Sequence, residues 1–358
     1  MPYRDMIKQR SGWYYGADLS ISSWMKSLGF PVKADPFGSD IESPLDRPEG
    51  DGGSTGPTRN IRVGNPIADV ESVVEGIEEV LRSGGDLVRV TGSTFRRVGE
   101  RNVPLADIAA LYENQVEAGD RMYDRWQEYY ADYVNEEVIP AWNAAQQSGA
   151  DVMIPGLEGI VGEDVEFAGL GARFAEWSDQ NAGILITSIS ESTRDAINGM
   201  VTQWGAFEPR DPRNVAQYIQ PLIGVTPRSA VAIARQADKM LKNGDTHEAV
   251  LRYIGIENAR RTKIRAELIA RTELAYAYNF GMWHSVMEVA DAGEFDENPV
   301  KVWFTQLDER VCPFCGPLHE AIVELGETYP GKTDRVRNTF APPAHPRCRC
   351  VLLYEFKE

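Results

Sequence analysis

The longest regular pattern in this sequence is a stripe of apolar residues at helical spacing that runs from Ile256 to Val289. Apolar residues that recur every three or four positions lie on one face of an α-helix. A helix of this length is well above the average of ~10–14 residues in globular proteins. The pattern therefore predicts an elongated body in which long helices pack side by side.

Shorter stripes predict further helices. They cover residues 66–82, the stretch from Pro104 to Pro140, 184–204, 212–220 and 227–243. Thr226 and Pro227 suit a helix start, and Gly244 suits a stop. The stripe that ends at Pro140 is rich in aromatic residues, and we interpret it as a packing face. Residues 149–171 break the pattern with repeated glycines, which indicates a loop or a short β excursion.

The N-terminal region differs in composition. Residues 1–33 mix aromatic and polar residues, and residues 34–62 are rich in Gly, Pro, Asp and Ser. The second segment is too polar to offset its chain entropy by burial, so we interpret it as a flexible linker. The first then becomes either a tethered docking arm or a tail packed on its own body. We expect a helical domain over 63–178 and a second domain over 179–358.

Charge is unevenly distributed. The net charge is −17, and residues 1–200 hold 17 Lys+Arg against 33 Asp+Glu. An acidic surface repels phosphate backbones, which argues against broad nucleic-acid binding there. The acid excess serves either solubility or docking to a basic partner. The sequence lacks both a run of about 18 apolar residues and the apolar core of a signal peptide. We therefore expect no membrane span, and a protein that works in the cell that makes it or in a particle assembled there.

Cysteine is confined to the C-terminal part of the chain. The pattern is Cys312-x-x-Cys315 and, later, His345-x-x-Cys348-x-Cys350, between predicted strands at 300–305 and 351–354. Such spacing is typical of a tetrahedral zinc site. We prefer the four cysteines as ligands, with His345 either the chief rival for one place or an outer hydrogen-bonding partner. A site with four protein ligands is structural. Unligated thiols and disulfides are the alternatives.

Basic residues lie close to the Cys/His pattern. The candidate phosphate contacts, which include contacts to packaged DNA, are Lys332, Arg335, Arg337 and Arg347, with Arg349 beside them. The patch lacks the interleaved aromatic residues that stack on single-stranded bases. For His247, His284 and His319, which have no matching partners in the sequence, we expect surface positions or ordinary hydrogen bonding.

Three runs of sequence resemble one family. RAELIARTELAYAYN at 265–279, KVWFTQLDERVCPFC at 301–315 and APPAHPRCRCVLL at 341–353 occur in an order that resembles the phage Mu F-like minor head proteins, also called head morphogenesis proteins. The resemblance covers roughly residues 180–353. In relatives an Asp-Gly turn often follows the second cysteine, whereas His319 and Glu320 stand here.

The resemblance implies a protein without settled catalytic chemistry that is present in a few copies in the virion. It would be assembled in the host cytoplasm and act at the portal vertex in head assembly, and in DNA packaging or ejection. Its partners would be the portal protein and the major capsid or scaffolding protein. The positions that match are Arg271, Thr272, Glu273, Trp303, Asp308, Arg310, Cys312, Cys315, Pro343, His345, Cys348, Arg349 and Cys350. We expect Arg271 and Glu273 to pair with Asp308 and Arg310.

Other classes of function remain as alternatives. A zinc-stapled DNA-binding adaptor is the nearest. Some family members are labelled ADP-ribosyltransferases, and the nearest fragments of such a site here are Glu163 to Glu166 and Ser188 to Ser190. A metal-dependent nuclease would need more well-placed histidines than the chain offers. We therefore predict a non-enzymatic assembly protein, mainly α with a small α+β C-terminal module at 300–354.

Overall fold

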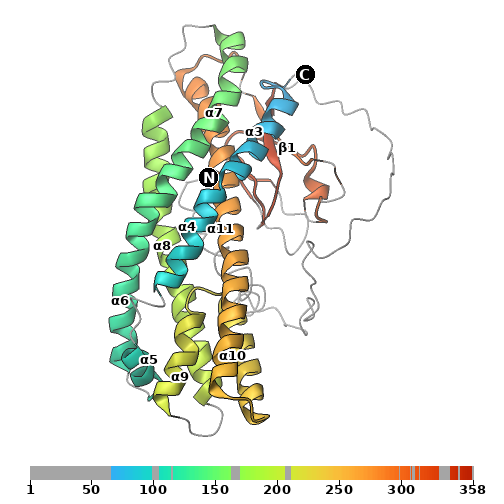
Figure 1. The fold of residues 1–358 in the computed structure, drawn as a ribbon. Helices are drawn as coiled ribbons and strands as arrows, with labels where there is room; N and C mark the ends of the chain where they lie inside the picture. Colours follow the sequence, from blue (N-terminus) through green and yellow to red (C-terminus); the bar gives the residue numbers. More distant parts are fainter. Residues whose placement is uncertain are drawn as a thin grey trace, which may run out of the picture.

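The computed structural model describes residues 66–98, 105–113, 116–162, 170–205, 211–297, 299–306, 308, 311–313, 315–329, 339–345 and 347–356. They form an elongated helical bundle with a small β-sheet module on one flank (Figure 1). The predicted fold class, mainly α with a small α+β module, is confirmed. The arm and the linker predicted before residue 63 lie outside the described residues, so the division into domains stays a prediction.

The helices vary widely in length. They are α3 (Val70–Ser83), α4 (Gly85–Arg97), α5 (Leu105–Tyr112), α6 (Val116–Tyr133), the π-helical turn η3 (Val134–Val138), α7 (Ile139–Val161), α8 (Leu170–Gly205), α9 (Pro212–Ile219), the 3-10 turn η4 (Gln220–Leu222), α10 (Pro227–Lys242) and α11 (His247–Ala292). None of the helices described is long and apolar enough to cross a membrane.

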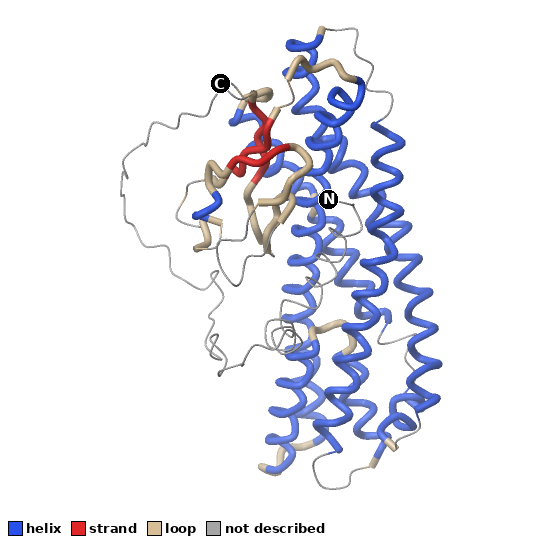
Figure 2. The backbone as a smooth tube through the Cα atoms, turned by 180° about the vertical axis from the view of Figure 1, so that it is seen from behind, coloured by secondary structure: helices blue, strands red, loops and turns tan. Residues whose placement is uncertain are grey.

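Helix α11 is the long helix that runs through the bundle (Figure 2). It has 46 residues and begins after Thr246, whose hydroxyl accepts a hydrogen bond from the Ala249 N–H. It ends at Gly293, which adopts a left-handed conformation with φ 75°. The predicted long helix is confirmed and starts earlier than its apolar stripe suggested, because a capping threonine rather than an apolar residue fixes the start.

Helix α7 crosses α11 at very short range. A Cβ atom added at Gly149 would lie 2.1 Å from the carbonyl oxygen of Tyr278, and one added at Gly281 would lie 1.9 Å from that of Gln146. Further along α7, a Cβ at Gly156 would lie 1.7 Å from the carbonyl oxygen of Ile67. The prediction of a loop or β excursion over 149–171 is therefore wrong for residues 149–161, while residues 163–169 lie outside the described residues. Two of these glycines are contact points of a helix that continues to Val161.

The expected interruption at Pro140 is also wrong. Pro140 lies in the first turn of α7, directly after η3, and the helical path runs on from α6. A proline within a continuing helix removes one backbone hydrogen bond, and here the π-helical turn η3, with its altered hydrogen-bond pattern, lies just before it. The aromatic stripe on this path is a packing face, as predicted, since Trp126, Tyr130 and Tyr133 are buried.

Helix α8 packs between α6 and α10, so these two helices occupy opposite sides of the bundle. A buried arginine of α11 ties the layers together. The Arg265 guanidinium donates to the carbonyl oxygens of Gly224 and Val225 and to the hydroxyl of Ser192 on α8. It also lies over the ring of Phe95, 4.8 Å from the centroid. This side chain satisfies the carbonyls of the turn that leads into α10.

His284 of α11 is buried among aromatic rings. The rings of Phe174, Phe280 and Trp283 lie 5.1–5.9 Å from it, centroid to centroid, and neither imidazole nitrogen has a hydrogen-bond partner among the described residues. The expectation of a surface or hydrogen-bonded histidine is wrong here. Burial, and secondarily the positive charge of Arg173, lowers the pKa of His284 from 6.5 to about 3. The folded protein therefore holds a neutral imidazole.

We predict that His284 destabilises the fold in acid. The unfolded chain takes up a proton at this residue below pH 6.5 and the folded chain does not, so stability falls as pH drops from 6.5 toward 3. The loss is about 1.4 kcal/mol per pH unit. In chemical denaturation at several pH values, His284→Phe should show a shallower decline than the wild type. Carboxylates titrate in the same range, so the measurement is the difference between the two proteins, and parallel curves would contradict the prediction.

Three antiparallel strands form the sheet of the C-terminal module. They are β1 (Val300–Phe304), β2 (Ile322–Glu324) and β3 (Val351–Glu355), in the order β2-β1-β3. The strand predicted from alternation at 300–305 and the strand predicted from the apolar run at 351–354 are both confirmed, whereas the three-residue β2 gave no signal. The sheet is attached to the bundle because the Asn279 side chain of α11 accepts from the Leu352 N–H at 2.9 Å. Ile67, before α3, donates to the Tyr354 carbonyl.

Lys301 is buried inside this module. Its ammonium group donates to the carbonyl oxygens of Glu327 and Phe340 and lies 3.3 Å from the centroid of the Phe340 ring. Burial lowers the pKa of Lys301 to about 6, and nearby Glu327 acts in the opposite direction. The side chain joins β1 to the two segments that follow β2 and precede β3. These contacts allow Lys301 to be buried together with the other four residues of β1.

Candidate metal centre

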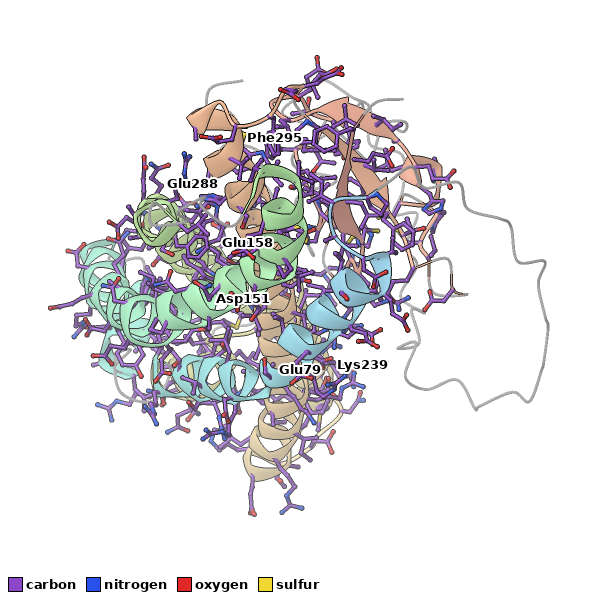
Figure 3. The ribbon with its side chains drawn as sticks, turned by 90° about the horizontal axis from the view of Figure 1, so that it is seen from above. Glu79, Asp151, Glu158, Lys239, Glu288 and Phe295 are labelled. Atoms are coloured by element: carbon purple, nitrogen blue, oxygen red, sulfur yellow. The ribbon has the colours of Figure 1, made fainter. Side chains whose placement is uncertain are left out.

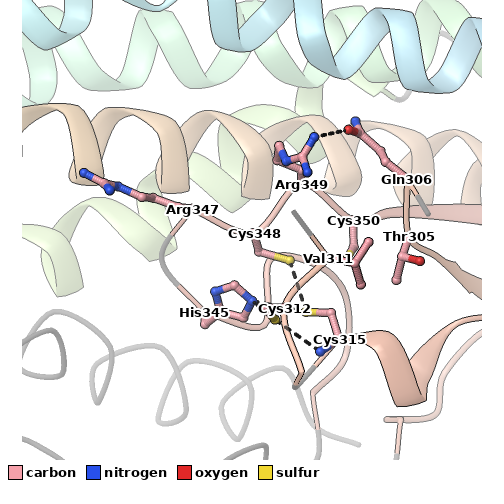
Figure 4. A pocket seen from close by; sticks show the side chains of 10 residues that line it. All are labelled: Thr305, Gln306, Val311, Cys312, Cys315, His345, Arg347, Cys348, Arg349 and Cys350. Atoms are coloured by element: carbon pink, nitrogen blue, oxygen red, sulfur yellow. Dashed lines mark hydrogen bonds between the residues drawn. The ribbon is translucent and has the colours of Figure 1, made fainter. Parts of the chain in front are cut away.

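Two turns at one end of the sheet bring five metal-ligating side chains together (Figure 4). Cys312 and Cys315 follow β1, and His345, Cys348 and Cys350 lead into β3. Because Phe304 pairs with Val351, the chain leaves β1 and enters β3 at the same end of the sheet. The sheet register therefore places the two motifs side by side, as their positions next to the predicted strands suggested.

The distances define two groups that share Cys315. In the first, the ligand atoms of Cys312, Cys315 and His345 all lie within 4.8 Å of one another. In the second, the same holds for Cys315, Cys348 and Cys350. Tetrahedral Zn²⁺ with Zn–S bonds of about 2.3 Å separates its sulfur ligands by about 3.8 Å. The Sγ atoms of Cys315 and Cys348 are 3.7 Å apart.

His345 lies close to the thiols of Cys312 and Cys315, although the sequence favoured the four cysteines as ligands. Its Nε2 atom is 2.9 Å from Sγ of Cys312 and 3.2 Å from Sγ of Cys315. Local turns fix both motifs. The Cys315 N–H donates to Sγ of Cys312 at 3.3 Å, and the Cys348 N–H donates to the His345 carbonyl at 3.1 Å. The backbone thus aims these side chains at a common point.

The electrostatics of the cluster favour a bound cation. Hydrogen bonding from Cys315, and then from His345, lowers the pKa of the Cys312 thiol to about 4 against the effect of burial. Hydrogen bonding to the Cys312, Cys348 and Cys350 sulfurs raises the pKa of Cys315. Neighbouring thiols at this spacing cannot all ionise without a counter-charge. A soft divalent ion would supply that charge and select thiolate and imidazole ligands.

Cys350 is in a different environment from the other thiols. It is buried, and the indole of Trp303 on β1 lies beside its sulfur. Hydrogen bonding with Cys315 lowers the pKa of Cys350, but the neighbouring sulfur of Cys348 and burial raise it, so the net shift of the pKa is upward. Cys350 thus borders the cluster on the side of the sheet.

Arg349 connects the two turns by hydrogen bonds that lie outside the cluster of thiols. Its guanidinium donates to the Gln306 side chain and, at 2.6 Å, to the carboxylate of Asp308. Both acceptors lie in the segment that leads from β1 to the first cysteine pair. An open pocket adjoins the cluster, and Arg347 and Arg349 are among the side chains that line it. Arg347 is exposed and has a positive φ of 63°.

The other predicted site residues have mixed outcomes. Glu273 is buried on α11, and the Thr272 hydroxyl donates to the Leu268 carbonyl of the same helix. Arg310 lies outside the described residues, and Asp308 forms an ion pair with Arg349. The expected lock between Arg271 and Glu273 on the helix and the turn therefore stays a prediction. The candidate phosphate contacts Lys332, Arg335 and Arg337 also lie outside the described residues.

The remaining histidines and the alternative catalytic fragments are also located. His319 accepts a hydrogen bond from the Thr305 N–H, and His247 bonds to Tyr218 and Gln217, so both are hydrogen-bonded as expected. Of the fragments that suggested an ADP-ribosyltransferase, Ser190 is buried within α8. Glu163, Glu166 and Ser188 fall among residues whose side chains are not described.

Sequence reasoning missed several residues that position the site. Gln306, Asn279 and Lys301 each fasten the module by a side-chain hydrogen bond. Only Lys301 carried a usable signal, since a lysine between Val300 and Val302 in a buried strand requires partners inside the protein. The other two are polar residues of a kind that is common at surfaces.

Comparison with known proteins gives one match. Residues 213–353 match the family described as phage Mu protein F like protein. The matching region begins in α9 and ends in β3, so it contains α11, the sheet and all five candidate ligands. It is shorter than the region over which the sequence runs suggested a resemblance. No curated protein and no solved structure matches the chain. Residues 213–353 are thus similar to the phage Mu protein F-like family, in agreement with the resemblance of the three sequence runs.

Proposed function

We propose that this chain is a minor head protein of a tailed bacteriophage that acts at the portal vertex during head assembly. The family match, which indicates head morphogenesis, supports this role. The proposed partners are the portal protein and the major capsid or scaffolding protein. The long helical body offers extended surfaces for such contacts, and the small C-terminal module attaches to one flank of it.

One observation carries the proposal. The three sequence runs that characterise the family converge on one module, in which Asn279 from the first run bonds to Leu352 from the third. The cysteines of the second run lie against those of the third. A chance likeness of three short motifs would not predict that they meet in space. Their convergence supports a shared architecture, and hence a shared role in the head.

We further propose that a structural zinc ion staples this module. Its ligands would be Cys312, Cys315, Cys348 and Nε2 of His345, with Cys350 outside the coordination sphere. The short distances from His345 to the first two sulfurs and the 3.7 Å separation of Cys315 and Cys348 support this choice. When bound, the ion would neutralise the thiolates and join the start of β3 to the turn after β1. Arg349, Gln306 and Asp308 would hold the same two turns from outside.

Localisation in the particle tests the assembly role. A phage that carries an epitope-tagged copy of this gene should yield procapsids and virions that contain the chain in a few copies. Cryo-electron microscopy without imposed icosahedral symmetry should show its density at the portal vertex. Deletion of the gene should reduce the yield of filled heads. Absence of the chain from procapsids and virions alike would overturn the proposal, whatever metal the purified protein contains.

A further inference from the structure

The outer face of α11 near its start combines positive charge with exposed apolar side chains. Arg252, Ile256, Arg260 and Ile264 follow one another at intervals of four residues, and all four are exposed. Ile256 is 62% exposed and Ile264 is 43% exposed. Lys263 lies on the same face and has no ion-pair partner among the described residues. We call these five residues the α11 cationic face.

The charges of this face are available to a partner. Arg252 contacts Glu248 at 3.4 Å, and Arg260 contacts Glu257 at 3.6 Å. The two arginine side chains are 71% and 62% exposed. Exposed pairs of this kind contribute little to stability, so a second carboxylate can replace the first at little cost. The exposed isoleucines have no such local partner, and their contact with water favours burial.

The opposite edge of the bundle carries a complementary row. Asp124, Glu128 and Asp132 on α6 and Glu136 on η3 also follow at intervals of four residues, and all are exposed. We call these four residues the α6 acidic row. Like charges four residues apart in a helix repel one another and destabilise it. No ion-pair partner for this row occurs among the described residues, which therefore do not offset that repulsion.

The two surfaces match in sign and in length. Each spans 13 residues. The 12 steps between the first and last residue correspond to about 18 Å of helix. Residues 227–265 contain nine Lys+Arg and four Asp+Glu, whereas residues 123–161 contain one Arg and seven Asp+Glu. Figures 1 and 3 show that α6 lies at one edge of the bundle, while α11 and Lys239 of α10 lie toward the other. Helix α8 separates the edges, so one molecule cannot bring its own two surfaces together.

We propose that copies of this chain associate with one another, the α11 cationic face of one against the α6 acidic row of the next. Carboxylates of the row would contact Arg252, Arg260 and Lys263. Ile256 and Ile264 would pack on the aliphatic parts of these charged side chains. A contact between two different surfaces leaves each pair with one free surface at either end, so it propagates into a ring or a filament. The inference does not depend on the proposed metal ion.

Sedimentation velocity of the full chain tests the association. In 50 mM NaCl the wild type should form larger species as its concentration rises from 5 to 200 µM. In 500 mM NaCl the association should weaken at least tenfold, because salt screens exposed charges. Wild type that stays monomeric at 200 µM in low salt would overturn the proposal.

Charge reversal identifies the surfaces. Glu128→Lys with Asp132→Lys reverses the α6 acidic row, and Arg252→Glu with Arg260→Glu reverses the α11 cationic face. Each variant alone should associate at least tenfold more weakly than the wild type. Their equimolar mixture should recover association, because each then offers the surface that the other has lost. Failure of the mixture to recover, with both variants folded by circular dichroism, would contradict the pairing.

A matched control separates this pairing from a general effect of net charge. Glu75→Lys with Glu79→Lys on α3 makes the same change in net charge as the α6 variant, on a different surface. It should associate like the wild type. A symmetric contact between two α11 faces would leave the α6 variant unaffected, and that result would overturn the proposed pairing.

Discussion

Replacement of Cys315 by serine should abolish binding of the proposed zinc ion and loosen the C-terminal module while the helical bundle stays folded. Cys315 is the one residue common to both groups of candidate ligands, and its Sγ lies within 4.8 Å of every other donor. A hydroxyl is a far weaker ligand for Zn²⁺ than a thiolate. Zinc binding in small modules contributes about 10–16 kcal/mol to folding, so loss of one ligand should have a large effect.

Elemental analysis and hydrogen exchange provide the measurements. Wild-type protein should contain one zinc ion per chain, and Cys315→Ser should contain almost none. Amide exchange should rise by at least tenfold over residues 299–356 and remain unchanged in α7 and the part of α11 that packs on it. In the phage, the same substitution, like Cys312→Ser, should lower the particle yield. Equal zinc content and exchange in variant and wild type would show that the thiols are incidental.

Two further variants test which four ligands hold the ion. Cys350→Ser should keep zinc at close to one ion per chain, because Cys350 borders the cluster and faces Trp303. His345→Ala should lose most of the zinc, because Nε2 of His345 approaches two sulfurs within 3.2 Å. With Co²⁺ in place of Zn²⁺, wild type and Cys350→Ser should give the same charge-transfer absorption, that of three thiolates. The reverse pattern, with zinc lost from Cys350→Ser and kept by His345→Ala, would assign all four cysteines instead.

Much of the fold was predictable because its signals are local. Periodicity gave α3, α10 and α11, and the alternation at residues 300–305 gave β1. The prediction failed where tertiary contact overrides a local preference. Glycine is unfavourable within a helix by about 1 kcal/mol, so Gly149 and Gly156 suggested a loop. In the folded chain their missing side chains allow the backbones to meet, and that packing is not visible in a single segment.

In the candidate site too, local features were predictable and tertiary contacts were not. Spacing identified five donors and their place beside two strands, because ligand spacing is a local property. It did not show that Nε2 of His345 would approach two sulfurs within 3.2 Å, because that proximity depends on how β1 and β3 pair. The hydrogen bonds of Gln306 and Asn279 depend on the same pairing. The exposed isoleucines of the α11 cationic face lie in a helix that periodicity had predicted. Their exposure could not be predicted, because it depends on where α8 and α10 pack.

Gly281→Ala should destabilise the bundle by at least about 3 kcal/mol, the upper part of the usual range for overpacked cores. The new methyl would lie 1.9 Å from the carbonyl oxygen of Gln146 and 2.6 Å from its carbonyl carbon. Both atoms belong to the backbone of α7, so no side chain can rotate away. The helices would have to separate at the point where α7 and α11 are most closely packed. Gly149→Ala, on the other side of the same crossing, should have a similar effect.

The same helix supplies the control for this prediction. Gly255 of α11 is exposed, and a Cβ atom there would meet nothing within 4 Å. Gly255→Ala should therefore stabilise the protein by about 0.5–1 kcal/mol, since alanine is the better helix former. Thermal and chemical denaturation of the three variants should place Gly281→Ala and Gly149→Ala below the wild type and Gly255→Ala above it. If Gly281→Ala were as stable as Gly255→Ala, α7 and α11 could not cross at the distance described, and the bundle would have a different packing.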